Sequence, residues 1–225
     1  MKMTKIALAC GAALLGTVSV AQAELSANIG VTSNYMWRGI TLSDEDAAIS
    51  GGVDYTHESG FYLGTWASST TSEVGTEVDL YGGFAGSSGD VGYDVGIVGY
   101  LYPNEKDISF TEIYGKLSWK WIEGGVYYTV SSDIDEGAYT DGDLYYYVGA
   151  SYELQDGWSL GATIGYYDFA DDGEAGVGDI SYMHYEASVT KDAGDFGALT
   201  MSIGEAEEES GSDDTHVWVS WTKSF

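Results

Sequence analysis

Charged side chains alternate with apolar ones along several segments of this chain of 225 residues. Asp54, Glu77, Asp79 and Glu112 are examples, each directly beside a valine or an isoleucine. Successive side chains of a β-strand point to opposite faces, so this alternation gathers the charges on one face. A face of carboxylates concentrates cations, which indicates cation binding or passage rather than bond-breaking chemistry.

One set of charged residues shares this polar face and is predicted to line a wet interior. The set is Arg38, Asp54, Glu77, Asp79, Asp94, Glu112, Lys116 and Lys120, with Glu153 and Glu186 at the same parity. Carboxylates outnumber cations in it, so we expect the interior to favour cations. Arg38 is expected to face Asp54, Glu77 and Asp79 from neighbouring strands. Two interpretations of Arg38 stay open: the cation of a constriction, or a structural ion pair that braces or plugs the interior.

Motifs for catalysis, metals and cofactors are weak. His57 and Glu58 do not begin a zinc motif, because no histidine follows at the required position. His184 and Ser188 share a strand face and are the best hydrolase candidate, although nothing in their spacing requires a catalytic pair. We expect no cofactor, no metal site and no catalytic residue. Nucleic acid is excluded as a partner, because a net charge of −28 leaves no basic surface for phosphate.

The elements that carry these residues are predicted to be β-strands, because helical periodicity is nearly absent and period-two alternation recurs. The segment 74–84 is the clearest, since Val78 and Leu80 alternate with Glu77 and Asp79. About twelve such segments are separated by turn residues. They are 25–38, 48–56, 60–68, 74–84, 91–102, 111–121, 122–131, 143–154, 158–167, 180–190, 196–204 and 216–225.

These strands suit either a soluble sandwich or barrel with the apolar face inside, or a transmembrane barrel with the apolar face in lipid. Strands of about 9–12 residues, long enough to cross a bilayer when tilted, favour the barrel. The last segment ends in Phe225 with Trp221 before it, which is typical of the assembly signal of outer-membrane barrels. Aromatic pairs at strand ends are expected at the lipid boundary. They are Tyr35/Trp37, Tyr100/Tyr102, Trp119/Trp121 and Tyr166/Tyr167.

Residues 1–23 are predicted to be a signal peptide, because two lysines precede an apolar run and Ala21-Gln22-Ala23 is a typical cleavage site. Residues 24–225 are then one domain without cysteine, since the only cysteine is Cys10. The predicted fold is an all-β, antiparallel, up-and-down transmembrane barrel of twelve strands. Six longer connections, expected on the outer side, carry a net charge of −21. They are 41–47, 69–73, 103–109, 131–143, 168–179 and 204–215.

Several motifs, in order along the chain, resemble those of a proteobacterial outer-membrane family. They are Asn34-Tyr35-Met36-Trp37-Arg38-Gly39-Ile40, Gly51-Gly52-Val53-Asp54-Tyr55, the segment 57–68, Glu112-Ile113-Tyr114 and the terminal Phe225. The likeness is close over 25–68 and patchy beyond. The chain resembles the TorF-type porins, formerly a conserved family of unknown function. The resemblance implies a bacterial outer-membrane barrel and names neither a solute nor a catalytic residue.

Together these observations predict an outer-membrane pore of a Gram-negative bacterium, exported through the Sec pathway. It would pass small hydrophilic solutes by diffusion, with a preference for cations. Expected partners are outer-membrane lipid, lipopolysaccharide, periplasmic chaperones and the barrel-assembly machinery. The alternatives are a non-conducting barrel that acts in adhesion or envelope integrity through its acidic loops, and a barrel hydrolase. The sequence leaves the solute and the oligomeric state open.

Overall fold

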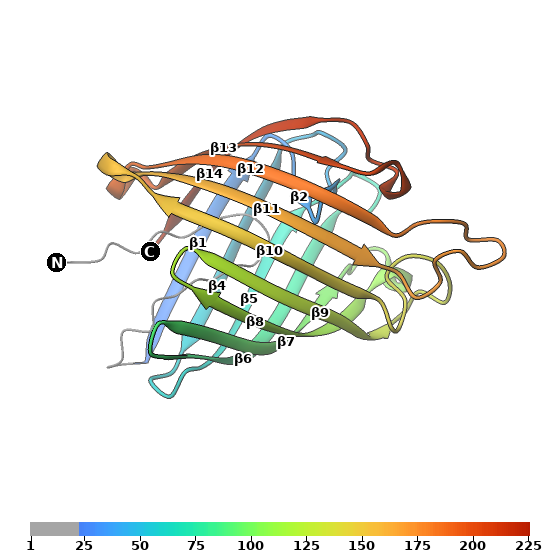
Figure 1. Cartoon of the computed structure of the whole chain (residues 1–225), viewed down its shortest axis with the longest axis horizontal. Coiled ribbons are helices and arrows are strands. Elements are labelled where there is room, and N and C mark those ends of the chain that lie inside the picture. The colour runs from blue at the N-terminus through green and yellow to red at the C-terminus, as the bar shows by residue number, and fades with distance from the viewer. Residues whose placement is uncertain (1–22) are drawn as a thin grey trace.

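Twelve antiparallel strands close into one barrel in the computed structural model, which describes residues 23–225 (Figure 1). The predicted fold class and strand number are therefore confirmed. Apart from Ala23, the predicted signal peptide lies outside the described residues. The barrel strands are β1 (Glu24–Thr32), β4 (Ala48–Thr56), β5 (Phe61–Ser69), β6 (Thr76–Ser88), β7 (Val91–Leu101), β8 (Phe110–Trp119), β9 (Ile122–Ser132), β10 (Leu144–Glu153), β11 (Trp158–Asp168), β12 (Tyr182–Asp192), β13 (Ala198–Ala206) and β14 (His216–Ser224).

Smaller elements lie in the connections between the barrel strands. Two short strands, β2 (Met36–Trp37) and β3 (Ile40–Thr41), pair with each other and form a separate hairpin. The part of the chain that the structure describes also has four single 3-10 turns, at Lys106–Ile108, Gln155–Gly157, Gly194–Phe196 and Glu208–Ser210. No helix within residues 23–225 is long and apolar enough to cross a membrane.

Closure of the barrel joins the first strand to the last. Each barrel strand pairs with its neighbours along the chain, and β1 pairs with both β4 and β14. The backbone N–H of Phe225 donates to the carbonyl of Ala27 at 2.8 Å and extends this seam. Closure pairs both edges of every barrel strand, and that is the condition for β-structure within lipid, where an unpaired backbone group costs several kcal/mol.

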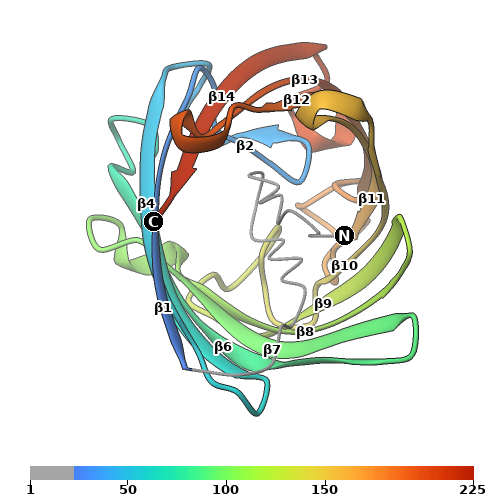
Figure 2. The same cartoon turned by 90° about the vertical axis from the view of Figure 1, so that its left-hand side faces the viewer.

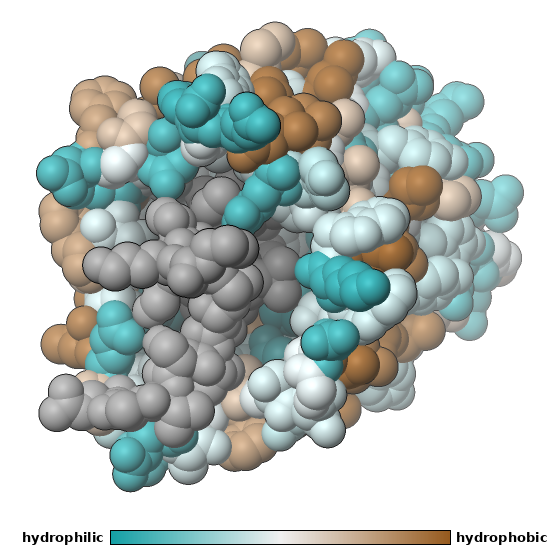
Figure 3. Space-filling model, turned by 60° about the vertical axis from the view of Figure 1, so that its left-hand side comes forward, coloured by the Kyte–Doolittle hydropathy of each residue, from teal (hydrophilic) through white to brown (hydrophobic). Residues whose placement is uncertain are grey.

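The polarity of the barrel is inverted relative to that of a soluble protein. Apolar side chains on the outer face are exposed, as at Ile49 (63%) and Leu117 (62%). Charged side chains on the inner face are buried, as at Glu77 (1%) and Glu112 (0%). Figure 3 shows the apolar side chains, in brown, on the flanks of the barrel. An apolar belt around a polar interior is the arrangement that suits lipid outside and polar contacts inside.

The two ends of the barrel differ in the length of their connections. β1 begins and β14 ends at one end, on the left in Figure 1, together with five short turns. These turns are 57–60, 89–90, 120–121, 154–157 and 193–197, and we call this end the short-turn end. The six other connections lie at the opposite end, the long-loop end. They are 33–47, 70–75, 102–109, 133–143, 169–181 and 207–215.

One connection at the long-loop end folds back into the barrel instead of projecting from it. This segment, residues 33–47, joins β1 to β4, and we call it the inserted hairpin; Figure 2 shows β2 inside the ring of strands. The alternation predicts a strand over 25–38, but β1 ends at Thr32. The apolar residues that follow are buried inside the barrel and do not face lipid: Tyr35, Met36 and Trp37 are 8%, 8% and 9% exposed.

Candidate functional site in the barrel interior

A tight turn at Arg38 and Gly39 reverses the inserted hairpin. Both residues have positive φ angles, 47° and 89°. Glycine adopts this conformation freely, whereas for arginine it costs about 1 kcal/mol, so contacts must hold Arg38 in place. A Cβ atom added at Gly39 would lie 2.4 Å from Cβ of His184 on β12. Glycine therefore serves both the turn and the close approach of the hairpin to the barrel wall.

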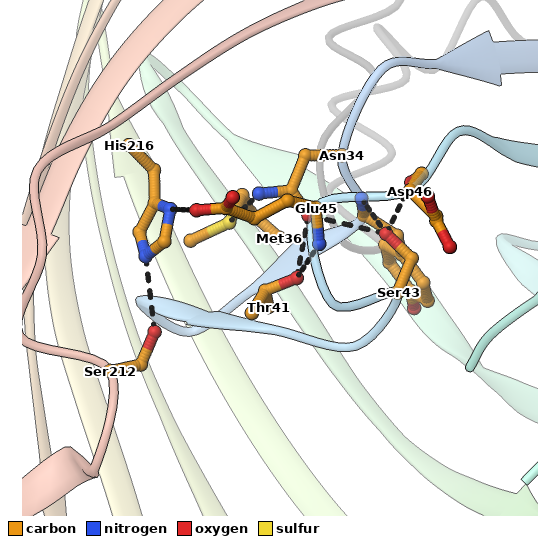
Figure 4. Close-up of polar contacts among 9 residues, drawn as sticks. Asn34, Met36, Thr41, Ser43, Glu45, Asp46, Ser212 and His216 are labelled. Carbon is orange, nitrogen blue, oxygen red and sulfur yellow. Dashed lines mark hydrogen bonds and ion pairs between the residues drawn. The ribbon is translucent and has the colours of Figure 1, made fainter. Parts of the chain in front are cut away.

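Hydrogen bonds within the inserted hairpin fix its shape (Figure 4). The hydroxyl of Thr41 donates to Oδ1 of Asn34 at 2.6 Å. The N–H of Tyr35 donates to Oγ of Ser43 at 2.8 Å, and the Ser43 hydroxyl donates to the carbonyl of Asp46 at 2.7 Å. Short polar side chains that bond to nearby backbone add to the short pairing of β2 with β3. The hairpin thus keeps a defined structure inside the barrel.

The inserted hairpin is attached to several strands of the wall. Oε1 of Glu45 lies 3.2 Å from Nδ1 of His216 on β14, and Nε2 of His216 lies 3.1 Å from Oγ of Ser212 (Figure 4). On another side, the hydroxyl of Tyr35 donates to Glu77 on β6 at 2.6 Å. The hairpin therefore spans the long-loop half of the interior between separate parts of the ring.

Arg38 extends this attachment to β8, which lies opposite β14 in the ring of strands. Its Nη1 and Nη2 atoms donate to the two carboxylate oxygens of Glu112 at 2.7 and 2.6 Å. The two side chains are 6% and 0% exposed. A two-point contact between guanidinium and carboxylate is strong and directional, and burial protects it from screening by salt. Arg38 thus fastens the tip of the hairpin to the wall.

Aromatic rings surround the Arg38 guanidinium. Its Cζ atom lies 4.3 Å from the ring centroid of Trp37, 4.7 Å from that of Tyr127, 4.2 Å from that of Tyr145 and 5.1 Å from that of Tyr167. The faces of these rings attract a cation at such distances. The guanidinium of Arg38 is therefore held by the carboxylate of Glu112 at its nitrogen atoms and by the aromatic rings around it.

Several aromatic pairs predicted for the lipid boundary belong to this interior cluster instead. Tyr35 and Trp37 lie in the inserted hairpin, and Tyr100 and Tyr167 point inward with exposed fractions of 4% and 0%. Tyr166 and Tyr167 are adjacent on β11 and point to opposite faces, so Tyr167 faces the interior when Tyr166 faces outward. Trp119 is 49% exposed and faces outward, as predicted.

An irregularity in the pairing of β8 with β9 positions Glu112. The register shifts between Thr111, which lies opposite Ser131, and Glu112, which lies opposite Thr129. A bulge of this kind changes the direction of a side chain and is common beside functional sites. The hydroxyl of Tyr167 also donates to Glu112 Oε1, at 3.4 Å. The wall therefore orients Glu112 independently of the hairpin.

A second pair of carboxylates lies on β6. Glu77 accepts hydrogen bonds from the hydroxyls of Tyr35 and Tyr102. Burial raises the pKa of Tyr35 well above its usual value of 10.0, so its hydroxyl stays protonated and donates. Asp79 is 5% exposed, and its Oδ1 atom has no hydrogen-bond partner among the described residues. These carboxylates add negative charge to this side of the interior.

Pairs of tyrosine and carboxylate continue toward the short-turn end. Tyr81 donates to Asp54 at 2.5 Å, and Tyr62 donates to Asp94 at 2.6 Å. Nζ of Lys116 lies 3.4 Å from Asp94. A hydrogen bond from a hydroxyl satisfies one oxygen of a carboxylate without cancelling its charge. The wall from β4 to β8 is thus lined by carboxylates that tyrosines hold in place.

The structure changes two predictions about the interior charges and adds one residue. Arg38 contacts Glu112 and not the three carboxylates expected, because the inserted hairpin carries it across the barrel. Lys120 is exposed in the turn after β8, with a φ of 56°, because the strand ends one residue earlier. Glu123 on β9 was missed, although it faces inward and accepts a hydrogen bond from Tyr147. Val126, Tyr128 and Val130 face outward at even positions of β9, so the odd position of Glu123 could have identified it as inward-facing.

The residues considered for hydrolysis are not brought together. His184 and Ser188 lie four positions apart on β12, which is about 13 Å along a strand. Nε2 of His184 lies 2.9 Å from the hydroxyl of Tyr145. Within residues 23–225, no group of three His, Cys, Asp or Glu side chains is arranged to hold a metal ion.

Residues 18–217 match the sequence pattern of a family described as bacterial protein of unknown function, Gcw_chp. The chain belongs to the Gcw_chp family. The match does not confirm the name TorF for this Gcw_chp protein. No curated protein shows a significant match to the chain.

The fold of this Gcw_chp protein is similar to that of solved outer-membrane proteins. A structure of the KdgM porin has a TM-score of 0.60 and 9% identity, over 89% of this chain and 99% of that chain. The NanC porin has a TM-score of 0.54 and 12% identity, over 89% and 98%. The COG4313 outer membrane channel from Pseudomonas putida F1 has a TM-score of 0.53 and 11% identity, over 92% and 97%. At these identities the likeness is one of fold.

Proposed function

We propose that this Gcw_chp protein is an outer-membrane channel for small hydrophilic solutes, with a preference for cations. The observation that carries the proposal is the inverted barrel, whose apolar outer face encloses an interior of carboxylates and tyrosines. The fold shared with porins and with another outer-membrane channel supports it. In this arrangement the short-turn end faces the periplasm and the long-loop end faces the outside, as is usual for such barrels.

The preference for cations follows from the charges along the route. Interior carboxylates outnumber the interior cations, and the six outer connections named from the sequence carry −21 in addition. The interior carboxylates are Asp54, Glu77, Asp79, Asp94, Glu112, Glu123 and Glu186, against the cations of Arg38 and Lys116. Fixed carboxylates raise the local concentration of cations and oppose the entry of anions.

We infer that the inserted hairpin closes the channel in the observed conformation. It reaches β6, β8 and β14, and its aromatic residues fill the interior between them. A solute that crosses the long-loop half must therefore pass where the hairpin is docked. We infer that release of the hairpin opens the channel, while the wall of the barrel stays in place.

Single-channel recording in a planar bilayer, with a salt gradient to give the reversal potential, tests the proposal. We expect open steps and a reversal potential on the cation-selective side. Glu77→Gln combined with Asp79→Asn should reduce this selectivity, because both side chains are interior. Asp213→Asn combined with Asp214→Asn is the matched control, since it removes the same charge from an exposed loop. Equal effects of the two pairs, or selectivity for anions, would contradict the interior carboxylates as the cause.

The docked hairpin also favours a second candidate function, a non-conducting barrel that acts in adhesion or envelope integrity through its acidic loops. In that case the barrel inserts into a bilayer without conducting. Variants that weaken the attachment of the hairpin separate the two functions. If the natural chain is silent and Arg38→Ala conducts, the barrel is a gated channel; if both are silent, the second candidate holds.

Assembly in the outer membrane is part of the proposal. Phe225 is 72% exposed at the end of the last strand, and Nε1 of Trp221 donates to the carbonyl of Phe196 at 2.8 Å. An exposed terminal aromatic residue suits recognition by the barrel-assembly machinery after escort by periplasmic chaperones. The apolar belt suits contact with outer-membrane lipid and lipopolysaccharide.

A further inference from the structure

The residues that contact Arg38 form a binding site on the barrel wall, whereas Arg38 itself comes from the inserted hairpin. The carboxylate of Glu112 and the rings of Tyr127, Tyr145 and Tyr167 belong to the barrel wall, on β8, β9, β10 and β11. Arg38 is supplied by the inserted hairpin. We call the wall component the guanidinium receptor. In the observed conformation the chain itself occupies this receptor.

The geometry of the guanidinium receptor selects a planar cation. Both oxygens of Glu112 accept from different nitrogen atoms of Arg38, at 2.7 and 2.6 Å. The hydroxyl of Tyr100 lies 3.3 Å from Nη2 as an additional acceptor. An ammonium group is a point charge that cannot make two parallel hydrogen bonds to one carboxylate and also present a flat face to aromatic rings. The receptor therefore distinguishes guanidinium from ammonium.

The receptor is held together without the hairpin. The bulge beside Glu112 and the hydrogen bond from Tyr167 orient the carboxylate from the wall. The rings also contact one another, with centroids 6.1 Å apart for Tyr127 and Tyr145 and 5.5 Å apart for Tyr145 and Tyr167. When Arg38 leaves, these side chains keep their neighbours. The receptor then faces the interior as a preformed site.

We propose that the guanidinium receptor binds solutes that carry a guanidinium group, and that Arg38 is an internal ligand which such solutes displace. Displacement frees the tip of the inserted hairpin and opens the long-loop half of the barrel. The inference rests on the proposed channel function for the route by which a solute arrives. It deepens that function by naming the class of solute.

Calorimetric titration of the purified barrel in detergent tests the receptor directly. The probes are agmatine, which carries a guanidinium and an amine, and 1,5-diaminopentane, which has a similar length and two ammonium groups. Arg38→Ala, which vacates the receptor, should bind agmatine about tenfold more tightly than 1,5-diaminopentane. The natural chain should bind agmatine more weakly than Arg38→Ala, because its own arginine competes. In Arg38→Ala combined with Glu112→Gln, the difference between the two probes should disappear.

Equal affinity of Arg38→Ala for the two probes, or no binding of agmatine to it, overturns the proposal. Selectivity that persists without Glu112 overturns it as well. If Arg38→Ala does not fold, Arg38→Gln replaces it, because glutamine still donates a hydrogen bond to Glu112 while it leaves the carboxylate uncompensated.

Conductance measured on the same variants separates this inference from the channel function. Selective binding of agmatine without any conductance supports the guanidinium receptor and refutes the channel function. Conductance in potassium chloride without selective binding of agmatine supports the channel function and refutes the receptor.

Discussion

Loss of the Arg38 side chain should release the inserted hairpin. Arg38→Ala leaves the carboxylate of Glu112 buried beneath the docked hairpin without its partner. Breaking a buried ion pair by removing one member costs about 3–5 kcal/mol. When the hairpin undocks, Glu112 regains water, so this cost falls on the docked state alone. At about 1.4 kcal/mol per factor of ten, the undocked population should rise by at least a hundredfold.

Labelling of a cysteine on the hairpin by a bulky maleimide measures this population. Met36→Cys places the thiol at a site that is 8% exposed, and residues 24–225 contain no other cysteine. We expect labelling to be slow in the docked protein and about a hundredfold faster with Arg38→Ala. Ala47→Cys, at an exposed position of the same segment, is the control and should react at one rate in both backgrounds.

A double variant tests whether the buried charge of Glu112 is the cause. Arg38→Ala combined with Glu112→Gln removes the uncompensated charge, so labelling at position 36 should slow partway toward the natural rate. An increase of less than about threefold with Arg38→Ala alone would show that the ion pair does not hold the hairpin. A double variant that reacts as fast as the single one would show that a buried carboxylate is not the cause.

Three other perturbations have defined outcomes. Gly39→Ala should raise the same labelling rate by about tenfold, because the new Cβ requires a positive φ and meets the barrel wall; an unchanged rate would contradict the close approach. Hydrogen bonds from backbone N–H groups lower the pKa of Asp172 below its usual value of 3.8, so they order its loop at neutral pH and are lost as the pH falls through the lowered pKa. Hydrogen exchange in that loop, corrected for intrinsic rates, should therefore accelerate below pH 4 in the natural chain and show no such acid transition in Asp172→Asn. Phe225→Ala should lower the amount of assembled barrel in the outer membrane severalfold, with the seam to Ala27 still forming on refolding in detergent; equal amounts in cells would remove the assembly role of the terminal phenylalanine.

The strands could be predicted from the sequence because alternation is a local property. Val78, Leu80 and their charged neighbours indicate a strand and its two faces without knowledge of the partner strand. The C-terminal segment 216–225 was found within one residue of β14, because Val217, Val219 and Trp221 lie at alternating positions before the terminal Phe225. Alternation alone did not distinguish the closed ring from a sandwich, and the length of the strands was what favoured the barrel.

The site was harder to predict because it depends on contacts between distant segments. From residue 33 to 37 the alternation continues, yet the chain leaves the sheet and its aromatic side chains are buried inside the barrel. Arg38 and Glu112 are 74 positions apart, and nothing local indicates that they meet. The bulge beside Glu112 likewise comes from the pairing of β8 with β9, which the pattern of either strand alone does not reveal.

The inserted hairpin is connected at both ends to the barrel that it occupies, at β1 and at β4. Arg38 therefore cannot diffuse away, and a short tether of this kind keeps a ligand at an effective concentration on the order of millimolar. A free solute of equal intrinsic affinity reaches half occupancy only when its own concentration matches that value. Rebinding of the tethered arginine needs no encounter in solution, so the interior closes again as soon as the solute departs. The covalent connection thus sets a threshold concentration of solute for opening, and the length of residues 33–47 determines that concentration.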